Sequence, residues 1–569
     1  MGINHKFLQL LVAGPLLYSL GLALHADIRA DSNRDGYVDL HDESDLLHKL
    51  EWKTKGALFM PNINDVTGNC YDWYRFGKFE RFEDFVACND ASDDMLRDKQ
   101  YLSPLATVPA ENISHDAWGT VEVHEEIARK NVRIFQDGNL ITNDYRFSSA
   151  ELKEGLNLGI DARDTRRPGG WDGRVEVHFH IQDGNKHSDD FVRLRVAPLL
   201  LSHSLQQVEF LELVDLPETT PPNIPQMLQE SFNDQFESIL ERSNLNNVPE
   251  IRHMFAHDQD QWYRDFASHA YISKPGPGRT IVLPVVLRSS QESRAGGRVA
   301  IENGRFFKGA GAIYSPGGTR DEINSMGNVM TIPPYRKGSK SFPAGRVIVG
   351  SHGSQNPHIL EYLRAQELQD PLILDSDWLA IGHLDEFLQF VPVPKGKSKH
   401  GWALLIADPL AGLDILINAS RKGHGSALAF SRRNESEKWM RDGPVPGYSI
   451  DELLRRPNFI KRNQDFAERI ERVQRRLIME TGLPKTDVYG LPMLFQTGIC
   501  WKADRGVSPK RNCSTSHATS LHPAVVNGVS LDRSHFVAPH PWGPVVDGVD
   551  ILEQSVNETF WGRPGVFRD

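Results

Sequence analysis

The chain has 569 residues, of which 39% are hydrophobic and 24% are charged, and its formal net charge is -11. This length exceeds one ordinary hydrophobic core, so we expect two to four domains. The 46 glycines and 34 prolines are typical of a globular, loop-rich protein with β-structure. An acidic chain without a basic cluster argues against nucleic acid as a partner.

The N-terminus begins with a short basic segment and continues with an apolar stretch over residues 7–24. A Gly-Pro pair interrupts this stretch, and the small residues Ala23 and Ala26 follow its core. This pattern predicts a secretory signal peptide over residues 1–26. No later segment is long and apolar enough to span a bilayer, so we expect a secreted protein without a membrane span.

Cysteines and glycosylation triplets agree with secretion. The four cysteines form two closely spaced pairs, which predicts two short-loop disulfides in an oxidising compartment: Cys70 with Cys88 and Cys500 with Cys513. Asn-x-Ser/Thr triplets also arise by chance, but they mark possible glycoprotein sites at Asn112, Asn418, Asn434, Asn512 and Asn557.

A loop rich in oxygen ligands follows the signal peptide. Gly36 supplies the sharp turn of an EF-hand-like loop, Val38 supplies its apolar position, and oxygen-bearing residues surround them. The spacing predicts a calcium site with the ligands Asp31, Asn33, Asp35, Tyr37, Asp39 and Asp42. The usual last ligand is a bidentate Glu, so Asp42 predicts modest affinity.

Alternating apolar and polar residues characterise the next region. Short runs with this period recur between Trp118 and Val196, with turns at Asp137-Gly138 and Asp183-Gly184. They predict an immunoglobulin-like β-sandwich over residues 115–200. Residues 27–114 would then form an N-terminal region that holds the calcium loop and the first cysteine pair.

Beyond Pro198 the pattern mixes strands with helices. Residues 465–480 predict one amphipathic helix, because its apolar side chains recur at helical spacing: Phe466, Ile470, Val473 and Leu477. Strands that alternate with helices predict an α/β or α+β catalytic-type domain over residues 201–569.

Two short stretches carry chemistry. If residues 381–390 form a strand, His383 and Asp385 project to one face, which places a proton donor beside a carboxylate. Such a pair is more often structural than catalytic. Trp262 lies among carboxylates in residues 258–265, and a flat ring beside anions suits a planar cation such as guanidinium.

Together these stretches resemble the protein-arginine deiminase family. The matching segments, in order, are Gln261-Trp262-x-x-Asp265, Leu283-Pro284-Val285-Val286, Gly327-Asn328, Ser376-Asp377-Trp378-Leu379-x-x-Gly382-His383-x-Asp385-Glu386-Phe387, Gly423-His424-Gly425 and Ala538-Pro539-x-Pro541-x-Gly543-Pro544-Val545. The resemblance covers most of residues 115–550.

The resemblance implies an α+β multidomain protein whose C-terminal domain is a five-module α/β propeller. It implies conversion of peptidyl-arginine to peptidyl-citrulline and ammonia, with arginine-containing proteins or peptides as substrates. Asp265 and Asp385 would bind the guanidinium, Trp262 would stack beside it, and His383 would protonate the departing ammonia. Arg294 would hold substrate backbone carbonyls.

The chain departs from the family pattern in two respects. The family's nucleophilic cysteine lies in a His-Cys-Gly-Thr-Asn-like motif, and we expect this chain to be truncated before it. Phe266 and Ser268 stand where animal enzymes carry calcium ligands, which makes the chain more similar to secreted microbial relatives. Animal members are cytoplasmic, which is the alternative location.

Three functional hypotheses therefore stay open. The first is a secreted deiminase of which this chain is a C-terminally truncated product. The second is a catalytically inactive protein that binds arginine-containing peptides or calcium. The third is a calcium-dependent structural protein of the cell surface, which rests on the loop of residues 31–42 alone.

Overall fold

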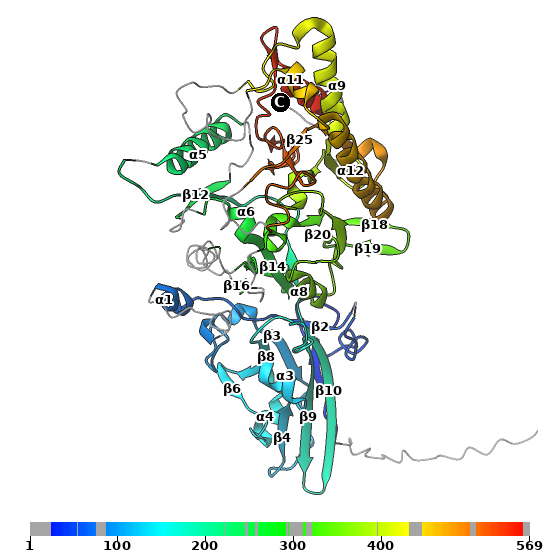
Figure 1. Ribbon diagram of the computed structural model, residues 1–569. Coiled ribbons are helices and arrows are strands. Elements are labelled where there is room, and N and C mark those ends of the chain that lie inside the picture. Colours follow the sequence, from blue (N-terminus) through cyan, green and yellow to red (C-terminus); the bar gives the residue numbers. More distant parts are fainter. Residues whose placement is uncertain are drawn as a thin grey trace, which may run out of the picture.

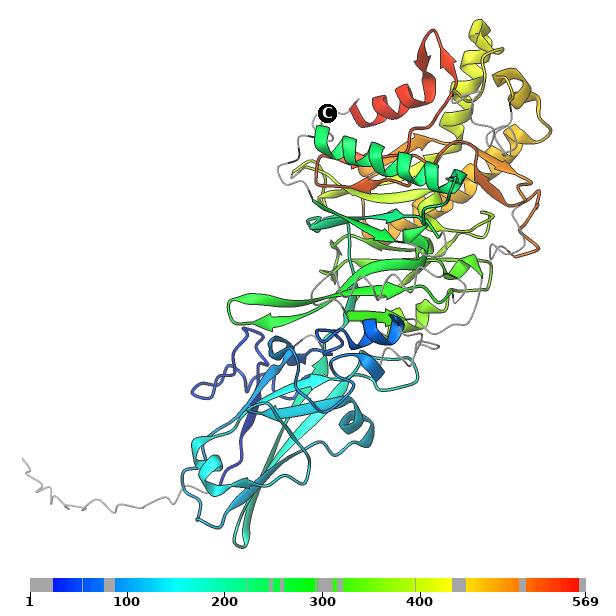
Figure 2. The same cartoon turned by 90° about the vertical axis from the view of Figure 1, so that its left-hand side faces the viewer.

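The computed structural model describes residues 24–53, 55–75, 87–221, 223–243, 245, 249–255, 260–291, 294, 311–314, 321–394, 396–431, 447–500 and 508–561. Most of the expected signal peptide lies outside these residues. The molecule is elongated, with a β-rich part at one end and an α/β part at the other (Figures 1 and 2). No helix in the described part has the length and apolar character needed to cross a membrane.

The β-rich part consists of two five-stranded sheets that share one hydrophobic core. The first sheet has the order β1 (Ile28–Ala30), β3 (Ser103–Thr107), β8 (Asn157–Ala162), β5 (Val132–Gln136) and β6 (Asn139–Ile141). The second has the order β2 (Ala57–Phe59), β10 (Lys186–Val196), β9 (Arg174–Asp183), β4 (Trp118–Glu122) and β7 (Phe147–Ser148).

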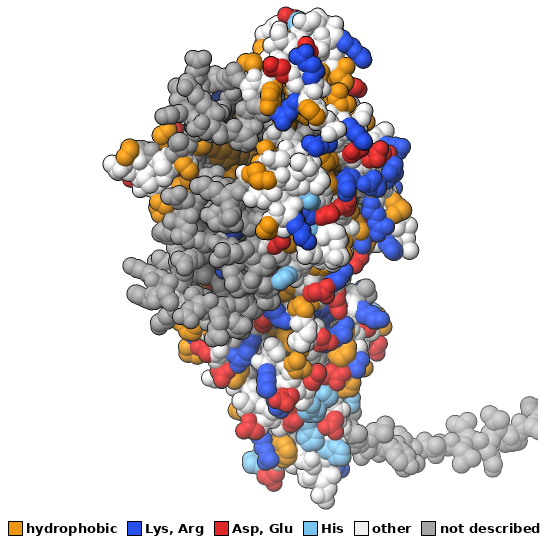
Figure 3. Space-filling view, in the orientation of Figure 1, with side chains coloured by type: hydrophobic (Ala, Val, Ile, Leu, Met, Phe, Trp, Pro, Cys, Tyr) orange, Lys and Arg blue, Asp and Glu red, His pale blue; other side chains and the backbone are white. Residues whose placement is uncertain are grey.

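Strand β9 shows how the sequence produces this arrangement. Its residues alternate between buried and partly exposed, so Val175, Val177 and Phe179 enter the core between the sheets. On the opposite face, histidines of β9 and β10 gather at the surface (Figure 3). Three short elements complete this part of the chain: α1 (Asn69–Arg75), α3 (Glu126–Asn131) and α4 (Ser149–Glu154).

The sandwich extends beyond the predicted range of 115–200. Strands β1, β2 and β3 come from the region before residue 115, and β2 pairs with the end of β10 through Leu58 and Arg195. Each of β1 and β2 has only three residues. Such short segments carry no readable period, so their place in the sheets depends on tertiary contacts.

The α/β part contains units in which an antiparallel pair is followed by a parallel third strand. The mixed α+β architecture is thereby confirmed. The first sheet is β11 (Leu199–Leu201), β14 (Ala267–Gly276), β15 (Arg279–Arg288) and β16 (Gly311–Tyr314), the second is β17 (Val329–Ile332), β20 (Arg346–Ser351) and β21 (Leu372–Asp375), and the third is β22 (Leu388–Pro392), β23 (Trp402–Asp408) and β24 (Val488–Pro492).

Helices connect the parallel strands of these units. Helix α8 (Ile359–Ala365) lies between β20 and β21, while α9 (Pro409–Ala419), α11 (Ile450–Arg455) and α12 (Phe459–Thr481) lie between β23 and β24. The smaller pairs are β12 (Phe210–Asp215) with β13 (Glu250–Phe255), β18 (Tyr335–Lys337) with β19 (Lys340–Phe342), β25 (Phe495–Thr497) with β26 (Ala518–Ser520), β27 (Val529–Ser530) with β28 (Phe536–Val537), and β29 (Val545–Val546) with β30 (Val549–Asp550). Helices α5 (Ile224–Arg242) and α13 (Ile551–Trp561) complete the set.

The amphipathic helix predicted over residues 465–480 is confirmed as the C-terminal two thirds of α12. Its four predicted core side chains are buried, and Phe466 stacks on Trp378 with ring centroids 5.4 Å apart. Each such buried side chain contributes about 1.5–3 kcal/mol of transfer free energy. The helix ends at Gly482, whose φ of 69° is the left-handed geometry of a C-terminal cap.

Candidate functional site

One short helix and three 3-10 turns bring the site residues together in the α/β part. Helix α6 (Tyr263–Phe266) carries Asp265, and the 3-10 turns η2 (Glu322–Asn324) and η3 (Met326–Asn328) precede β17. A third turn, η4 (Leu384–Glu386), follows His383. Each turn is too short to be stable alone, so packing against the others must hold it in place.

Asn328 fixes the middle turns. Its buried amide Nδ2 donates hydrogen bonds to the carbonyls of Ile323 and Gly350, each at 3.0 Å. Ser325 begins η3, and its hydroxyl oxygen accepts the Gly327 N–H at 3.2 Å while it donates to Asp265 Oδ1 at 3.0 Å. The turn that positions Gly327 therefore also orients the Asp265 carboxylate.

The strand assumed for residues 381–390 is wrong in part. His383 precedes the 3-10 turn η4 and Asp385 lies within it, and β22 begins only at Leu388. Both side chains are nevertheless buried, and both lie next to Gly327. A Cβ atom on Gly327 would lie 2.9 Å from Asp385 Oδ2, 2.9 Å from His383 Nδ1 and 3.0 Å from Asp265 Oδ1. The structure thus brings together the three predicted catalytic residues.

Glu386 shapes the backbone of this turn. Its carboxylate accepts the N–H groups of Gly382 at 3.1 Å and His383 at 2.9 Å. Gly382 has a φ of 90°, and a Cβ there would lie 1.9 Å from His352 Nε2. Only glycine fits this close approach, which directs His383 toward Asp265.

Arg294 does not face an open cleft. Its guanidinium lies 3.0 Å from Asp265 Oδ2, 3.1 Å from Glu322 Oε2 and 3.3 Å from Asp260 Oδ1, and its side chain is 14% exposed. The predicted role in binding substrate backbone carbonyls stays a prediction. In this structure Arg294 instead occupies the carboxylates with its own guanidinium.

Glu322 was missed by sequence reasoning, although it lies close to the Gly327-Asn328 motif. Its carboxylate Oε2 is 3.6 Å from His383 Nε2, and His383 Nε2 donates to the Glu322 carbonyl at 3.1 Å. On the other side of the ring, His383 Nδ1 lies 3.6 Å from Asp265 Oδ1. The sequence gives no sign that Glu322 belongs to the site, because an acidic residue in a turn is common. Only the fold brings it next to the ring of His383, which lies 61 positions away.

Electrostatics favour a protonated His383. Burial alone would lower its pKa, but the hydrogen bond with Glu322 and the charges of Asp265 and Asp385 outweigh burial and raise the pKa to about 10. Burial raises the pKa of Asp385 to about 6, against the opposing effect of His383, and raises that of Glu386 to about 7. At neutral pH the imidazolium can therefore donate a proton beside ionised Asp385.

This pKa predicts a pH-dependent stability. A raised histidine pKa stabilises the fold fully below about pH 6.5, and the contribution is lost as the pH rises toward 10. With pKa values of about 6 and about 7, Asp385 and Glu386 are largely ionised above about pH 8, so they add little change beyond that pH. Between about pH 8 and 10 the unfolding free energy should therefore fall by up to about 1.4 kcal/mol per pH unit, and urea denaturation of His383→Asn should lack this slope. An equal slope in both proteins would contradict the assignment.

Trp262 and Arg264 lie on either side of this cluster. Trp262 is 54% exposed, and its backbone N–H donates to Asp260 Oδ1 at 3.3 Å. The stacking of its indole on a substrate guanidinium stays a prediction. Arg264 donates to Ser268 Oγ at 2.9 Å. Arg264 and Asp385 also line a cavity of about 830 Å³, together with apolar side chains of α5 and the C-terminal segment.

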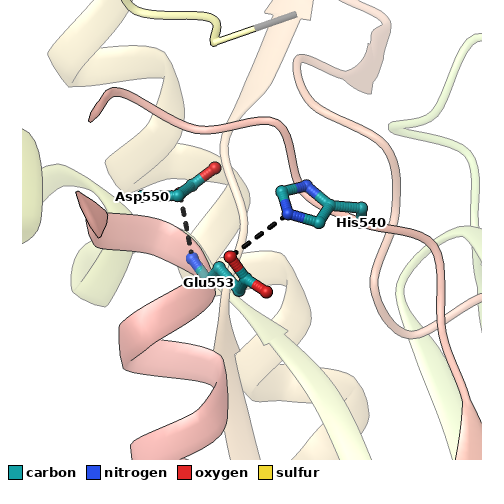
Figure 4. Close-up of side chains that lie close together, drawn as sticks. All are labelled: His540, Asp550 and Glu553. Atoms are coloured by element: carbon teal, nitrogen blue, oxygen red, sulfur yellow. Dashed lines mark hydrogen bonds and ion pairs between the residues drawn. The ribbon is translucent and has the colours of Figure 1, made fainter. Parts of the chain in front are cut away.

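The described residues include one further group with metal-ligand chemistry, namely His540, Asp550 and Glu553 (Figure 4). Asp550 Oδ1 accepts the N–H groups of Leu552 and Glu553, which caps α13. The Trp542 N–H donates to His540 Nδ1 at 2.9 Å, so the neutral ring carries its proton on Nε2, which lies 3.2 Å from Glu553. That nitrogen has no lone pair for a metal, and we assign the group to capping.

Side-chain oxygens of the predicted calcium loop accept hydrogen bonds from its own backbone. Asp31 is buried and accepts the N–H groups of Asp35 and Gly36, and burial with the charges of Asp45 and Asp35 raises its pKa to about 6. Asp42 is exposed and caps Ser44 instead. Asp45, with 0% exposure, accepts the N–H groups of Ser32, Asn33 and Asp39. Side-chain oxygens are the donors that calcium prefers, and the predicted ligands, Asp42 among them, stay a prediction.

The remaining predicted ligands form turns within the same loop. Asn33 Oδ1 accepts the Asp35 N–H, Asp35 Oδ1 accepts the Tyr37 N–H, and Asp39 Oδ1 accepts the His41 N–H. Tyr37 is itself exposed. The two disulfides pair Cys70 with Cys88 and Cys500 with Cys513, as the spacing predicted, so the chain has no free cysteine.

Comparison with known proteins assigns the chain to a family. Residues 186–563 match the family model described as protein-arginine deiminase. The chain belongs to the protein-arginine deiminase family. It is 30% identical over 307 residues to human protein-arginine deiminase type-3, across 52% of this chain and 41% of that protein. It is 29% identical over 383 residues to human protein-arginine deiminase type-4, across 64% of this chain and 50% of that protein.

A rat relative gives the same result. Rat protein-arginine deiminase type-3 is 27% identical over 406 residues, across 68% of this chain and 54% of that protein. The chain thus spans about half the length of the curated relatives that it matches. The family match includes all five predicted residues of the arginine site: Trp262, Asp265, Arg294, His383 and Asp385.

Proposed function

We propose that this chain forms the guanidinium-binding and proton-donating side of a peptidyl-arginine deiminase site. One observation carries the proposal: Asp265, Glu322 and Asp260 already bind a guanidinium, that of Arg294, directly beside His383. Carboxylates in a plane fix the flat guanidinium cation. A peptidyl-arginine would enter the same carboxylates in place of Arg294.

The chemistry assigns a role to each residue. A cysteine thiolate would attack the guanidinium carbon and form a C–S bond, and the C–N bond to one amino group would then break. His383 would give its proton to that group, which leaves as ammonia, and water would later release citrulline and the thiol. Asp265 and Asp385 would hold the substrate cation during both steps.

All four cysteines of the chain are in disulfides, so none of them is available as a free thiolate. The same observation favours a second candidate function, the binding of arginine-containing peptides without turnover. Both functions use the same carboxylates and both predict selectivity for arginine over citrulline.

Calorimetry with an arginyl peptide tests the shared part of both functions. We expect saturable binding by the chain, and a loss of at least about tenfold in affinity for Asp265→Asn, since the neutral amide keeps the shape but loses the charge. Citrullyl and lysyl peptides serve as ligand controls, because citrulline has no charge and lysine has no planar fork. Equal binding of all three peptides, or unchanged binding by Asp265→Asn, would contradict the proposal.

We further propose a secreted protein that binds calcium through residues 31–45. The two disulfides support an oxidising compartment. The buried Asp31 and Asp45 support the calcium site, because a cation would relieve the repulsion between their carboxylates. The five-module propeller also belongs to this proposal, with the three strand units of the α/β part as its basis.

A further inference from the structure

Four arginines gather on the outer face of the sandwich, where it meets the α/β part. Arg174 on β9 and Arg195 on β10 are direct cross-strand partners, although like charges at such positions repel. Arg34 from the loop after β1 and Arg166 from the segment between β8 and β9 lie close enough for their charges to act on Arg195. Figure 1 shows β2, which pairs with the end of β10, near α8 at this junction.

Glu367, just after α8, is the shared carboxylate of this arginine cluster. It lies 2.8 Å from Arg166 Nη1, 3.4 Å from Arg174 Nη2 and 4.0 Å from Arg195 Nη1, and its side chain is 49% exposed. Arg174 also contacts the exposed Asp172 at 3.3 Å. For Arg166 and Arg195, Glu367 is the one carboxylate among the described residues within ion-pair distance. A single half-exposed charge therefore serves three guanidinium groups.

The cluster contains buried N–H donors that have no acceptor among the described residues. They come from all four arginines and from the neighbouring Trp52, whose ring lies 5.7 Å from the Arg174 guanidinium. The atoms are Arg34 Nη2, Trp52 Nε1, Arg166 Nε, Arg174 Nε and Arg195 Nε. An unpaired buried donor costs about 1–3 kcal/mol, so five in one place indicate a missing acceptor rather than five separate defects.

The excess positive charge of the cluster also indicates a missing acceptor. Burial, together with the positive charges of Arg166 and Arg34, lowers the pKa of Arg195 to about 10. Arg166 is 1% exposed, so water does not solvate its charge. A bound anion would remove both penalties at once.

A cavity borders the cluster at Arg34. It has a volume of about 380 Å³, and its lining includes Arg34, Lys274 and Arg279 along with one acidic residue, Asp35. Leu58 lines it as well, and Leu58 is the β2 partner of Arg195. The three cations around this cavity would attract an anion toward Arg34.

We propose that the arginine cluster of Arg34, Arg166, Arg174 and Arg195 binds a tetrahedral oxyanion of the phosphate class. The unpaired groups are donors only, which excludes a cation as the ligand and favours one with several acceptor oxygens. Guanidinium forks bind phosphate oxygens in pairs, and a dianion offsets more of the excess charge than chloride or a carboxylate does. The site is separate from the arginine site of the α/β part and does not depend on its function.

Calorimetric titration of the full chain with inorganic phosphate tests this proposal. We expect saturable binding that Arg195→Gln weakens by at least about tenfold. Glu367→Gln should strengthen phosphate binding by about fivefold, because it removes the carboxylate that competes with the ligand. This gain cannot result from misfolding. Arg475→Gln is the matched control, since Arg475 pairs with Glu471 on the exposed face of α12.

Titrations with sulfate and with chloride distinguish specific oxyanion binding from a general effect of salt. Sulfate should bind in the same way as phosphate, whereas chloride at equal ionic strength should not reproduce the heat or the rise in melting temperature. If chloride reproduces the effect, then ionic screening of the arginine charges explains it, and the proposal is overturned. Unchanged or weaker phosphate binding by Glu367→Gln would overturn it as well.

Discussion

Replacing Arg294 with Gln should lower the stability of the protein and raise its affinity for arginyl peptides. The guanidinium of Arg294 contacts three largely buried carboxylates, those of Asp260, Asp265 and Glu322. Removing one partner of a buried ion pair costs about 3–5 kcal/mol, because the remaining charges are left uncompensated. Urea denaturation should detect this loss, and Arg475→Gln, which breaks only an exposed pair with Glu471, should change stability by less than about 1 kcal/mol.

The gain in affinity follows from competition. Arg294 occupies the carboxylates that a substrate guanidinium needs, so an arginyl peptide must displace it. If the open state is about 10% populated, removal of Arg294 raises the apparent affinity about tenfold. An arginyl peptide at 100 times its dissociation constant should then restore about 2.7 kcal/mol of stability to Arg294→Gln. Unchanged stability together with unchanged peptide affinity would show that Arg294 does not occupy the substrate position.

Sequence reasoning predicted those parts of the fold that depend on long, regular patterns. The helix α12 was predictable because four apolar residues recur at helical spacing over three turns. The sandwich strands β9 and β10 were predictable because apolar and polar residues alternate along most of β9 and at the C-terminal end of β10. The three-residue strands β1 and β2 lack such a pattern. Their positions depend on pairing with β3 and β10, which lie far away in sequence.

The arginine site shows a different limit. The motif identified His383, Asp385 and Asp265, but the strand assumed for the first two is a 3-10 turn. The contacts of Glu322 and Arg294 could not be predicted from the sequence, because they depend on how separate turns pack around Gly327. Similarly, the loop spacing carried no signal for Asp45, which is fully buried in the fold, while Asp42 accepts the N–H of Ser44. A sequence motif identifies which residue types belong to a site. Which residues contact one another there depends on how turns that are distant in sequence pack together.

Gly327→Ala should abolish arginyl-peptide binding while it leaves the fold intact. The new Cβ would lie within 3.0 Å of side-chain atoms of Asp265, His383 and Asp385, which is closer than real Cβ contacts allow. The φ of Gly327 is not in the left-handed region, so the backbone tolerates alanine there. The clash therefore displaces the functional groups rather than the turn. Misplaced by even about 1 Å, such groups lose about 100-fold in activity or affinity.

The measurement compares calorimetric affinity with the melting temperature. For Gly327→Ala we expect no binding at peptide concentrations that saturate the unmodified chain, and a melting temperature within about 4 °C of it. Gly170→Ala is the matched control, because Gly170 is exposed, has no left-handed φ and meets only Arg167 at 3.3 Å. Full peptide affinity in Gly327→Ala would mean that the space around Gly327 is not where the guanidinium binds. Loss of binding with intact folding would place the substrate cation at the point where Asp265, His383 and Asp385 converge.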